Sequence, residues 1–206
     1  MVNYPNGSKN IFHAENNIIK KSSEPTFSRR GMTLEEEINE SNEYYLATDQ
    51  AVIHKKPTPI QIVSVDYPKR SRAVIKEAYF RTASTTDYNG VYRGYYVDFE
   101  AKETKNKLSF PLKNFHEHQI IHFEKCLAQD GICFVIIKFS TLGRYFVTPA
   151  SLIIDNFNRA DDRKSIRLTD IEAVSIEITN GYRPTLAYLT AVDKLIQKKE
   201  TKTKND

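Results

Sequence analysis

The chain lacks the features that mark membrane proteins, exported proteins and disulfide-rich proteins. Its longest apolar run, residues 132–137, has six residues, whereas a helix needs roughly 20 to cross a bilayer. Residues 1–30 contain no apolar stretch of the kind found in secretory signals. The two cysteines, Cys126 and Cys133, are too few for a disulfide framework or a zinc site made of thiolates. We therefore expect a cytoplasmic protein without a membrane span.

The composition is that of a folded protein. The 206 residues are 40% hydrophobic and 11% aromatic, which is enough for one hydrophobic core. Charged residues make up 27% of the chain. Disorder of the whole chain is therefore not expected.

Positive charge is concentrated in one internal segment. Residues 31–53 carry six acidic residues and no basic ones, whereas residues 54–81 carry seven basic residues against two acidic ones. The second segment therefore has a net charge of +5, more than the +4 of the whole chain. Such a segment either contacts a polyanion or forms a solvated basic loop, and charge alone leaves both interpretations open.

Three regions differ in composition. Residues 1–30 are rich in Asn, Ser, Lys and Pro and end in Arg29-Arg30, which predicts a flexible basic arm. Residues 31–195 carry the periodic patterns of a folded domain. Within them, prolines and positive charge at 57–81 predict a projecting hairpin or stalk. Residues 196–206 read as a polar tail.

The periodic patterns predict an α/β fold. Thr33 and Glu36 have capping-box spacing, and Leu34, Ile38 and Tyr45 recur at helical spacing after them. Further helices are predicted from Asn114 to about 129, at 150–156 and at 186–196. Strands are predicted at 51–54, 60–65, 95–102, 132–137, 145–147 and 173–178. Residues 67–70 and 90–94 read as turns, and 73–80 is either a strand or a short helix.

One strand carries a candidate active site. Residues 95–102 alternate between apolar and polar side chains, so Glu100 and Lys102 lie on one face, about 6.5–7 Å apart. A hairpin through the turn at 90–94 can bring Asp87 beside them. Two carboxylates suit a hard cation such as Mg²⁺, and a lysine there can stabilise charge on a phosphorane. This predicts phosphodiester hydrolysis by metal-activated water; the alternative is an ordinary surface Glu–Lys pair.

The words around these residues resemble one nuclease family. Asp87…Glu100-x-Lys102 matches the core of the PD-(D/E)xK superfamily, with Thr86 in place of the proline. Further words are similar to the RecU Holliday junction resolvases of Gram-positive bacteria: Asn3-Tyr4-Pro5-Asn6-Gly7, Arg30-Gly31-Met32-Thr33-Leu34-Glu35, His54-Lys55-Lys56-Pro57-Thr58-Pro59, Tyr67-Pro68-Lys69-Arg70, Ser84-Thr85-Thr86-Asp87-Tyr88-Asn89-Gly90, Asp98-Phe99-Glu100-Ala101-Lys102-Glu103-Thr104, Phe115-His116-Glu117-His118-Gln119 and Gln129-Asp130-Gly131-Ile132-Cys133-Phe134. The resemblance runs from about residue 3 to beyond residue 180.

The resemblance implies a fold and a site. The fold is a restriction-endonuclease-like core, with a mixed central sheet flanked by helices and a projecting stalk. The implied metal ligands are Thr85, Asp87, Glu100 and Gln119, with Lys102 as the transition-state stabiliser. The implied cofactor is Mg²⁺, for which Mn²⁺ substitutes. The residues alone favour a surface position for Gln119, although its spacing from Phe123 turns it toward the core.

The resemblance also implies a substrate and partners. The substrate is four-way junction DNA, nicked on two opposing strands to leave 5′-phosphate and 3′-hydroxyl ends. Two matched cuts need two sites, so the junction's symmetry predicts a homodimer. The implied partners are the RecA recombinase and the RuvAB branch-migration proteins, at the nucleoid. Predicted DNA contacts are Arg29, Arg30, Lys55, Lys56, Lys69, Arg70, Arg72, Lys76 and Arg81.

Several alternatives remain open from the sequence. Tyr67, Tyr79 and Phe80 either stack on exposed bases or pack within the stalk. Two functions other than junction resolution remain open: a non-catalytic architectural protein that binds branched DNA, and a site-specific nuclease that acts on duplex DNA. His118 and His122 have the spacing of a zinc protease, but Gln119 cannot act as the general base. Glu36 is a further acidic residue that can approach the metal.

Overall fold

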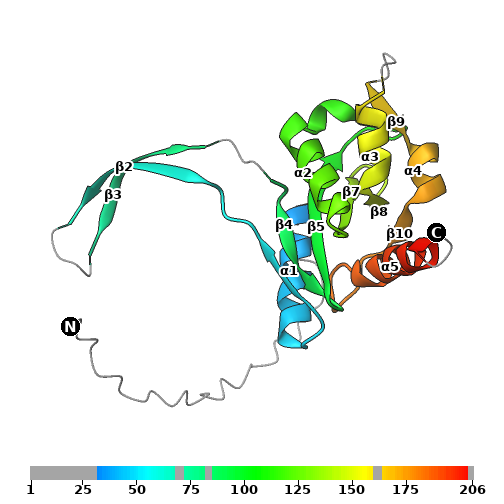
Figure 1. Cartoon of the computed structure of the whole chain (residues 1–206), viewed down its shortest axis with the longest axis horizontal. Coiled ribbons are helices and arrows are strands. Elements are labelled where there is room, and N and C mark those ends of the chain that lie inside the picture. Colours follow the sequence, from blue (N-terminus) through cyan, green and yellow to red (C-terminus); the bar gives the residue numbers. More distant parts are fainter. Residues whose placement is uncertain (1–31, 68–71, 82–84, 160–163, 204–206) are drawn as a thin grey trace. The chain divides into compact units, whose positions relative to one another are not determined.

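A computed structural model describes residues 32–67, 72–81, 85–159 and 164–203 (Figure 1). The predicted arm at residues 1–30 lies outside this part, as do Lys69 and Arg70. In the described part, no helix combines the length and apolar character needed to cross a bilayer.

A six-stranded mixed sheet forms the centre of the fold. Its strands lie in the order β1 (Val52–Lys55), β4 (Tyr88–Tyr92), β5 (Tyr95–Thr104), β7 (Ile132–Phe139), β8 (Arg144–Pro149) and β10 (Ile176–Ile178). Only the β5–β7 pair is parallel, and the four other neighbouring pairs are antiparallel. The predicted α/β class with a mixed central sheet is confirmed.

Helices cover both faces of this sheet. On one face, α1 (Leu34–Ala47) and α5 (Leu189–Thr203) pack on Phe134 and Ile136 of β7. On the other, α2 (Glu117–Ala128), α3 (Ala150–Phe157) and α4 (Leu168–Val174) pack around Val135 and Ile137. Every residue of β7 is buried, as the continuous apolar run predicts for a central strand.

The first helix begins as the sequence predicts. The Oγ1 atom of Thr33 accepts a hydrogen bond from Glu36 N, and Glu36 Oε2 accepts one from Thr33 N at 2.7 Å. This capping box satisfies free N–H groups at the helix start. The hydrogen bonds from Thr33 lower the pKa of Glu36. The Glu36 carboxylate is thus engaged at the helix start, and its approach to a metal stays a prediction.

The insertion is a hairpin with its own hydrogen bonds. Strands β2 (Ile60–Asp66) and β3 (Val74–Phe80) pair antiparallel and form a separate two-stranded sheet. The segment that reads as a strand or a short helix is therefore a strand. All residues of β3 are exposed, so these strands do not belong to the core. A third small sheet pairs β6 (Ser109–Pro111) with β9 (Ser165–Arg167), and a 3-10 turn, η2 (Leu112–Asn114), follows β6.

The turn before β5 is shorter than predicted. Gly90 lies inside β4, where a Cβ atom would come 2.0 Å from the carbonyl oxygen of Val52. The absence of a side chain at Gly90 allows β1 to pair closely with β4. The turn itself lies at Arg93 and Gly94, whose φ angles are 50° and 81°.

Two helix predictions and one strand prediction need correction. Asn114 ends a 3-10 turn, and α2 begins at Glu117, where Gln119 Oε1 accepts from His116 N at 3.0 Å. The predicted strand 173–178 is wrong in its first part: α4 runs through Val174, because Leu168 and Ile171 share a buried helix face, and only Ile176–Ile178 is a strand. Helix α5 begins later than predicted and continues to Thr203.

Candidate metal and catalytic site

Glu100 is the centre of the predicted site. It lies on the face of β5 that α2 covers, and only 1% of its surface is exposed. Its Oε1 atom accepts hydrogen bonds from Lys102 Nζ and Gln119 Nε2, each at 2.6 Å. Its Oε2 atom accepts one from the backbone N of Asp87 at 3.1 Å. The structure therefore brings together four of the five residues that the resemblance implies.

The β4–β5 hairpin explains why Asp87 and Glu100 meet. Tyr88 pairs with Phe99 in the antiparallel register, so Asp87 lies beside Glu100 just before β4 begins. The Oδ2 atom of Asp87 lies 3.5 Å from the backbone N of Ala101. The predicted hairpin juxtaposition is thus confirmed.

The environment of Glu100 disfavours its charged form. Burial and the negative charge of Asp87 raise its pKa, Lys102 opposes both effects, and the resulting pKa is about 7. Lys102 is itself mostly covered, with 19% of its side chain exposed. Two crowded carboxylates whose charge one lysine only partly balances are suited to hold a cation.

Gln119 and Thr85 are placed differently from each other. Gln119 is 5% exposed, which confirms that it faces inward; its amide NH₂ group faces Glu100 and its carbonyl accepts from His116 N. Thr85, a metal ligand that the resemblance implies, is half-buried and lies in a bend rather than in a strand. Its Oγ1 atom lies 3.4 Å from the carbonyl oxygen of Thr86.

A second buried carboxylate lies on the same strand face. Asp98 has no exposed surface and accepts from Lys56 Nζ at 2.8 Å, from Tyr96 Oη at 2.7 Å and from Thr86 Oγ1. His122 Nε2 lies 3.1 Å from the same carboxylate. Lys56, a predicted DNA contact, therefore has its ammonium in an internal ion pair. The sequence alternation places Asp98 on this face, but gives no sign of its burial.

The neighbours of His122 resemble a soft-metal site only in part. Donor atoms of Asp98, His122 and Cys126 all lie within 4.8 Å of one another. However, the ammonium of Lys56 already contacts Asp98, and its positive charge opposes a cation there. The ring of His118 stacks on His116 instead, with centroids 5.5 Å apart. The two histidines of the zinc-protease spacing thus have different partners.

The other predicted basic contacts in the described part of the chain lie at the surface, Lys55 at the end of β1 and the rest in the insertion. Lys55 pairs with Glu35, and Lys76 pairs with Asp66 at 2.8 Å. Arg81 donates to Gln61 at 3.1 Å, and Arg72 is exposed. All four side chains are exposed to solvent.

The aromatic residues of the hairpin are also exposed. Tyr67, Tyr79 and Phe80 expose 68%, 59% and 83% of their surfaces. The alternative in which these rings pack within the stalk is therefore not what the structure shows. Their exposed faces are available for stacking.

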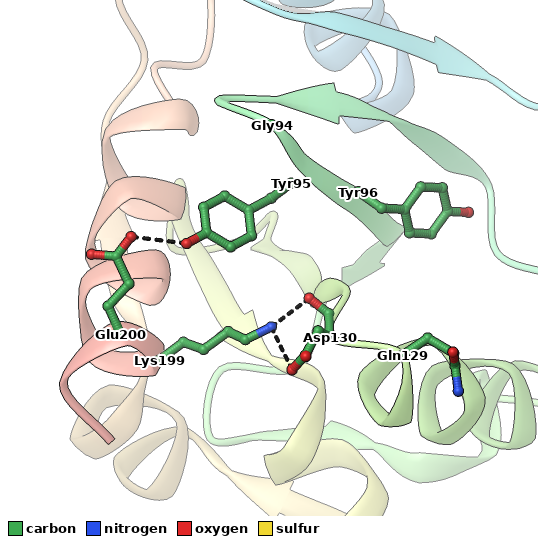
Figure 2. A pocket seen from close by; sticks show the side chains of 7 residues that line it. All are labelled: Gly94, Tyr95, Tyr96, Gln129, Asp130, Lys199 and Glu200. Atoms are coloured by element: carbon green, nitrogen blue, oxygen red, sulfur yellow. Dashed lines mark hydrogen bonds and ion pairs between the residues drawn. The ribbon is translucent and has the colours of Figure 1, made fainter. Parts of the chain in front are cut away.

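The surface also has an open depression whose lining includes neither Asp87 nor Glu100. About 730 Å³ in volume, it is lined by the turn at Gly94, the end of α2 and the last helix (Figure 2). Lys199 bonds Asp130 across it, and Tyr95 donates to Glu200 at 2.8 Å. These contacts hold α5 to the neighbouring loops. We therefore interpret the depression as a consequence of how α5 packs and not as a binding site.

A search against known families matches this chain over most of its length. The model described as "Recombination protein U" matches residues 29–194. A protein of Lactobacillus delbrueckii subsp. bulgaricus is 64% identical over 200 residues, covering 95% of each chain. A protein of Lactobacillus acidophilus is 61% identical, covering 95% of this chain and 97% of its own. Both bear the name "Holliday junction resolvase RecU".

Among solved structures, the Hjc Holliday junction resolvase of Archaeoglobus fulgidus is similar to 64% of this chain and 86% of its own, at 10% identity and a TM-score of 0.38. The family model spans both the β4–β5 hairpin and α2, so Asp87, Glu100, Lys102 and Gln119 all fall within the match. The chain belongs to the RecU family.

Proposed function

We propose that this protein is a divalent-metal-dependent endonuclease that resolves four-way DNA junctions. The observation that carries the proposal is the meeting of Asp87, Glu100, Lys102 and Gln119 around one buried carboxylate. The names of the relatives support the same activity. The architectural alternative needs none of these contacts.

The donor set fits a hard cation. Asp87 and Glu100 offer carboxylate oxygens, as Mg²⁺ prefers and Mn²⁺ tolerates. Thr85 and Gln119 would add neutral oxygens, Gln119 after turning its amide oxygen from His116 N toward the cation. The raised pKa of Glu100 is consistent with this role, because a bound cation would relieve the repulsion between the two carboxylates. When bound, the cation would supply a water activated for attack and polarise the scissile phosphate.

The protein's own groups have distinct tasks. Lys102, held at 2.6 Å from Glu100, would stabilise the negative charge that develops on the phosphate oxygens. The attacking water forms the new P–O bond, and the bond to the 3′ oxygen breaks. That oxygen takes up a proton, so the products carry 5′-phosphate and 3′-hydroxyl ends.

Resolution needs two such sites. One chain supplies one site, and a four-way junction is separated by matched cuts in opposing strands, so we propose a two-fold homodimer. The exposed lysines, arginines and aromatic rings of the β2–β3 hairpin would contact the phosphates and bases near the crossover. Action on chromosomal junctions would place the protein at the nucleoid, where RecA and RuvAB are candidate partners.

A matched pair of lysine variants tests the proposal. Lys102→Ala should lower the rate of junction cleavage at least about 100-fold, because one stabilising charge at a reacting centre is commonly worth that much. Lys105→Ala removes an exposed lysine just beyond the same strand and should change the rate little. A labelled synthetic junction and a linear duplex of the same sequence are incubated with Mg²⁺, Mn²⁺ or EDTA.

Symmetric nicks only on the junction and only with metal would support the proposal, provided Lys102→Ala still binds the junction. Retained cutting by Lys102→Ala would contradict the mechanism. Binding without cleavage under both metals would favour the architectural alternative, and equal cutting of the linear duplex would favour a duplex nuclease.

A further inference from the structure

We propose that Asp98 is a positioning residue, which holds the loop carrying Asp87 and the helix carrying Gln119 in register with Glu100. The inference rests on the proposed function, because it concerns the same metal-binding residues. It assigns a role to a buried carboxylate that itself reaches neither the substrate nor the metal.

The first tether runs to the loop. Thr86, which directly precedes Asp87, is 3% exposed and donates its hydroxyl proton to Asp98 Oδ1. Lys56 Nζ bridges the two side chains, at 2.9 Å from Thr86 Oγ1 and 2.8 Å from Asp98 Oδ2. The backbone N of Lys56 also donates to the carbonyl oxygen of Asp87 at 2.7 Å. Side-chain and backbone contacts thus fix the residue on each side of the Thr86–Asp87 bond.

The second tether runs to α2. His122 lies three residues after Gln119, so the two side chains share one face of the helix. Its Nε2 atom lies 3.1 Å from Asp98 Oδ2, and because a carboxylate oxygen accepts, the ring donates at this nitrogen. The contact fixes α2 against β5 one turn from the amide that bonds Glu100.

Burial explains why these tethers hold position. A carboxylate with no exposed surface is costly unless its oxygens are satisfied. Asp98 has four donors on its two oxygens. Displacing a donor would leave a buried charge partly unpaired, so each tether resists movement. The elements fixed in this way carry three of the four proposed metal ligands, Asp87, Glu100 and Gln119. The fourth, Thr85, directly precedes Thr86, whose side chain bonds Asp98.

Conservative variants test this role by measuring metal binding directly. Thr86→Val keeps the shape of the side chain and removes the loop tether, and Asp98→Asn removes the shared charge. The matched control is Tyr96→Phe, which removes another hydrogen bond to Asp98 and one that Tyr96 accepts from Asn89 on β4, but neither bond reaches α2 or the Thr86–Asp87 bond. Mn²⁺ binding to the DNA-free protein is followed by electron paramagnetic resonance, and cleavage is measured as a function of Mn²⁺ concentration.

We expect Thr86→Val and Asp98→Asn to bind Mn²⁺ about 10- to 100-fold more weakly, the usual effect of losing a group that orients a metal ligand. The Mn²⁺ affinity of Tyr96→Phe should stay within about twofold of the wild-type affinity, because this variant frees no element that carries a metal ligand. Excess Mn²⁺ should restore cleavage by Thr86→Val but not by Lys102→Ala, because only the first defect lies in metal affinity.

Two results would overturn the positioning role while leaving the proposed function intact. One is wild-type Mn²⁺ affinity in a folded Thr86→Val protein, which remains testable even if Asp98→Asn fails to fold. The other is an equal loss of affinity in Tyr96→Phe, which would indicate a general disturbance. A wild-type protein that cleaves no junction and binds no Mn²⁺ would overturn the proposed function itself, and the positioning role with it.

Discussion

Glu100 carries an electrostatic cost that the rest of the site must offset. The side chain is almost fully buried beside a second carboxylate, and three hydrogen bonds hold it in one orientation. Its pKa of about 7 means that, without a metal, the protonated form is populated near neutral pH. At this residue, binding a cation and losing a proton are therefore coupled.

This coupling predicts a pH dependence of stability in the metal-free protein. An ordinary glutamate titrates near 4.5, and Glu100 titrates at about 7 in the folded chain. Between these values the unfolded chain has lost the proton and the folded chain keeps it, so the free energy of unfolding should fall as pH rises. Glu100→Gln should remove this pH dependence. The difference in free energy of unfolding between the wild type and Glu100→Gln should therefore change by up to about 3 kcal/mol between the two pKa values.

Urea unfolding in EDTA at several pH values measures that difference. Parallel curves for the wild type and Glu100→Gln would show that the pKa of Glu100 is close to its ordinary value. A metal added above pH 7 should stabilise the wild type more than the variant, because only the wild type offers two carboxylates.

At the scale of elements, periodicity predicts some features and misses others. The alternation in β5 correctly puts Glu100 and Lys102 on one face, and the apolar run correctly predicts β7 as buried. Periodicity does not show that α2 covers the polar face of β5. That depends on how the chain crosses over from β5 to its parallel neighbour β7, through α2. The burial of Asp98 and the inward turn of Lys56 follow from this packing and have no local signal.

The strand β4 was missed for a local reason. Gly90 and its neighbours resemble a turn, and only the approach of Val52 explains why a glycine is needed inside a strand. The family resemblance implies a site role for Gln119, whereas the residues alone favour a surface position for it, even though its spacing from Phe123 turns it toward the core. Resemblance therefore supplied the site residues that depend on long-range packing.

The β2–β3 hairpin allows stability and DNA binding to be separated. Phe80 is 83% exposed, so Phe80→Ser should change the free energy of unfolding by no more than about 0.5 kcal/mol. If the ring stacks on a base, the same change should weaken junction binding by about 5- to 150-fold, the equivalent of 1–3 kcal/mol. Gel shifts in EDTA measure the affinity without cleavage.

Leu108→Ser is the matched control, because Leu108 is 78% exposed and lies outside the hairpin. It should affect neither stability nor junction affinity. Equal affinities for the wild type, Phe80→Ser and Leu108→Ser would exclude stacking by Phe80.

At the scale of the whole molecule, the site is built from one chain but the proposed reaction needs two. Asp87, Glu100, Lys102 and Gln119 all belong to the same chain. These proposed site residues therefore come from one copy of the chain. A second copy would add the matched cut on the opposing strand.

Mixed dimers test this arrangement. Wild-type and Lys102→Ala chains, carrying different affinity tags, are purified as a heterodimer with twice the 23.8 kDa mass of one chain. We expect it to nick one strand of the junction at about the rate of a single wild-type site and to release few resolved duplexes. Full resolution by the heterodimer, or a mass of one chain in light scattering, would contradict paired action by two sites.

The hydrogen bond between Lys56 N and Asp87 O has a consequence for the length of the chain between them. It joins the two points at which the inserted segment leaves and rejoins the central sheet, and a second bond, from Arg81 N to Pro59 O, closes the base of the hairpin. The entropy of closing a loop rises only with the logarithm of its length. Once these points are joined, the inserted segment can lengthen or shorten at little cost to the core. The length of the inserted segment can thus vary without loosening the contacts that hold Asp87 beside Glu100.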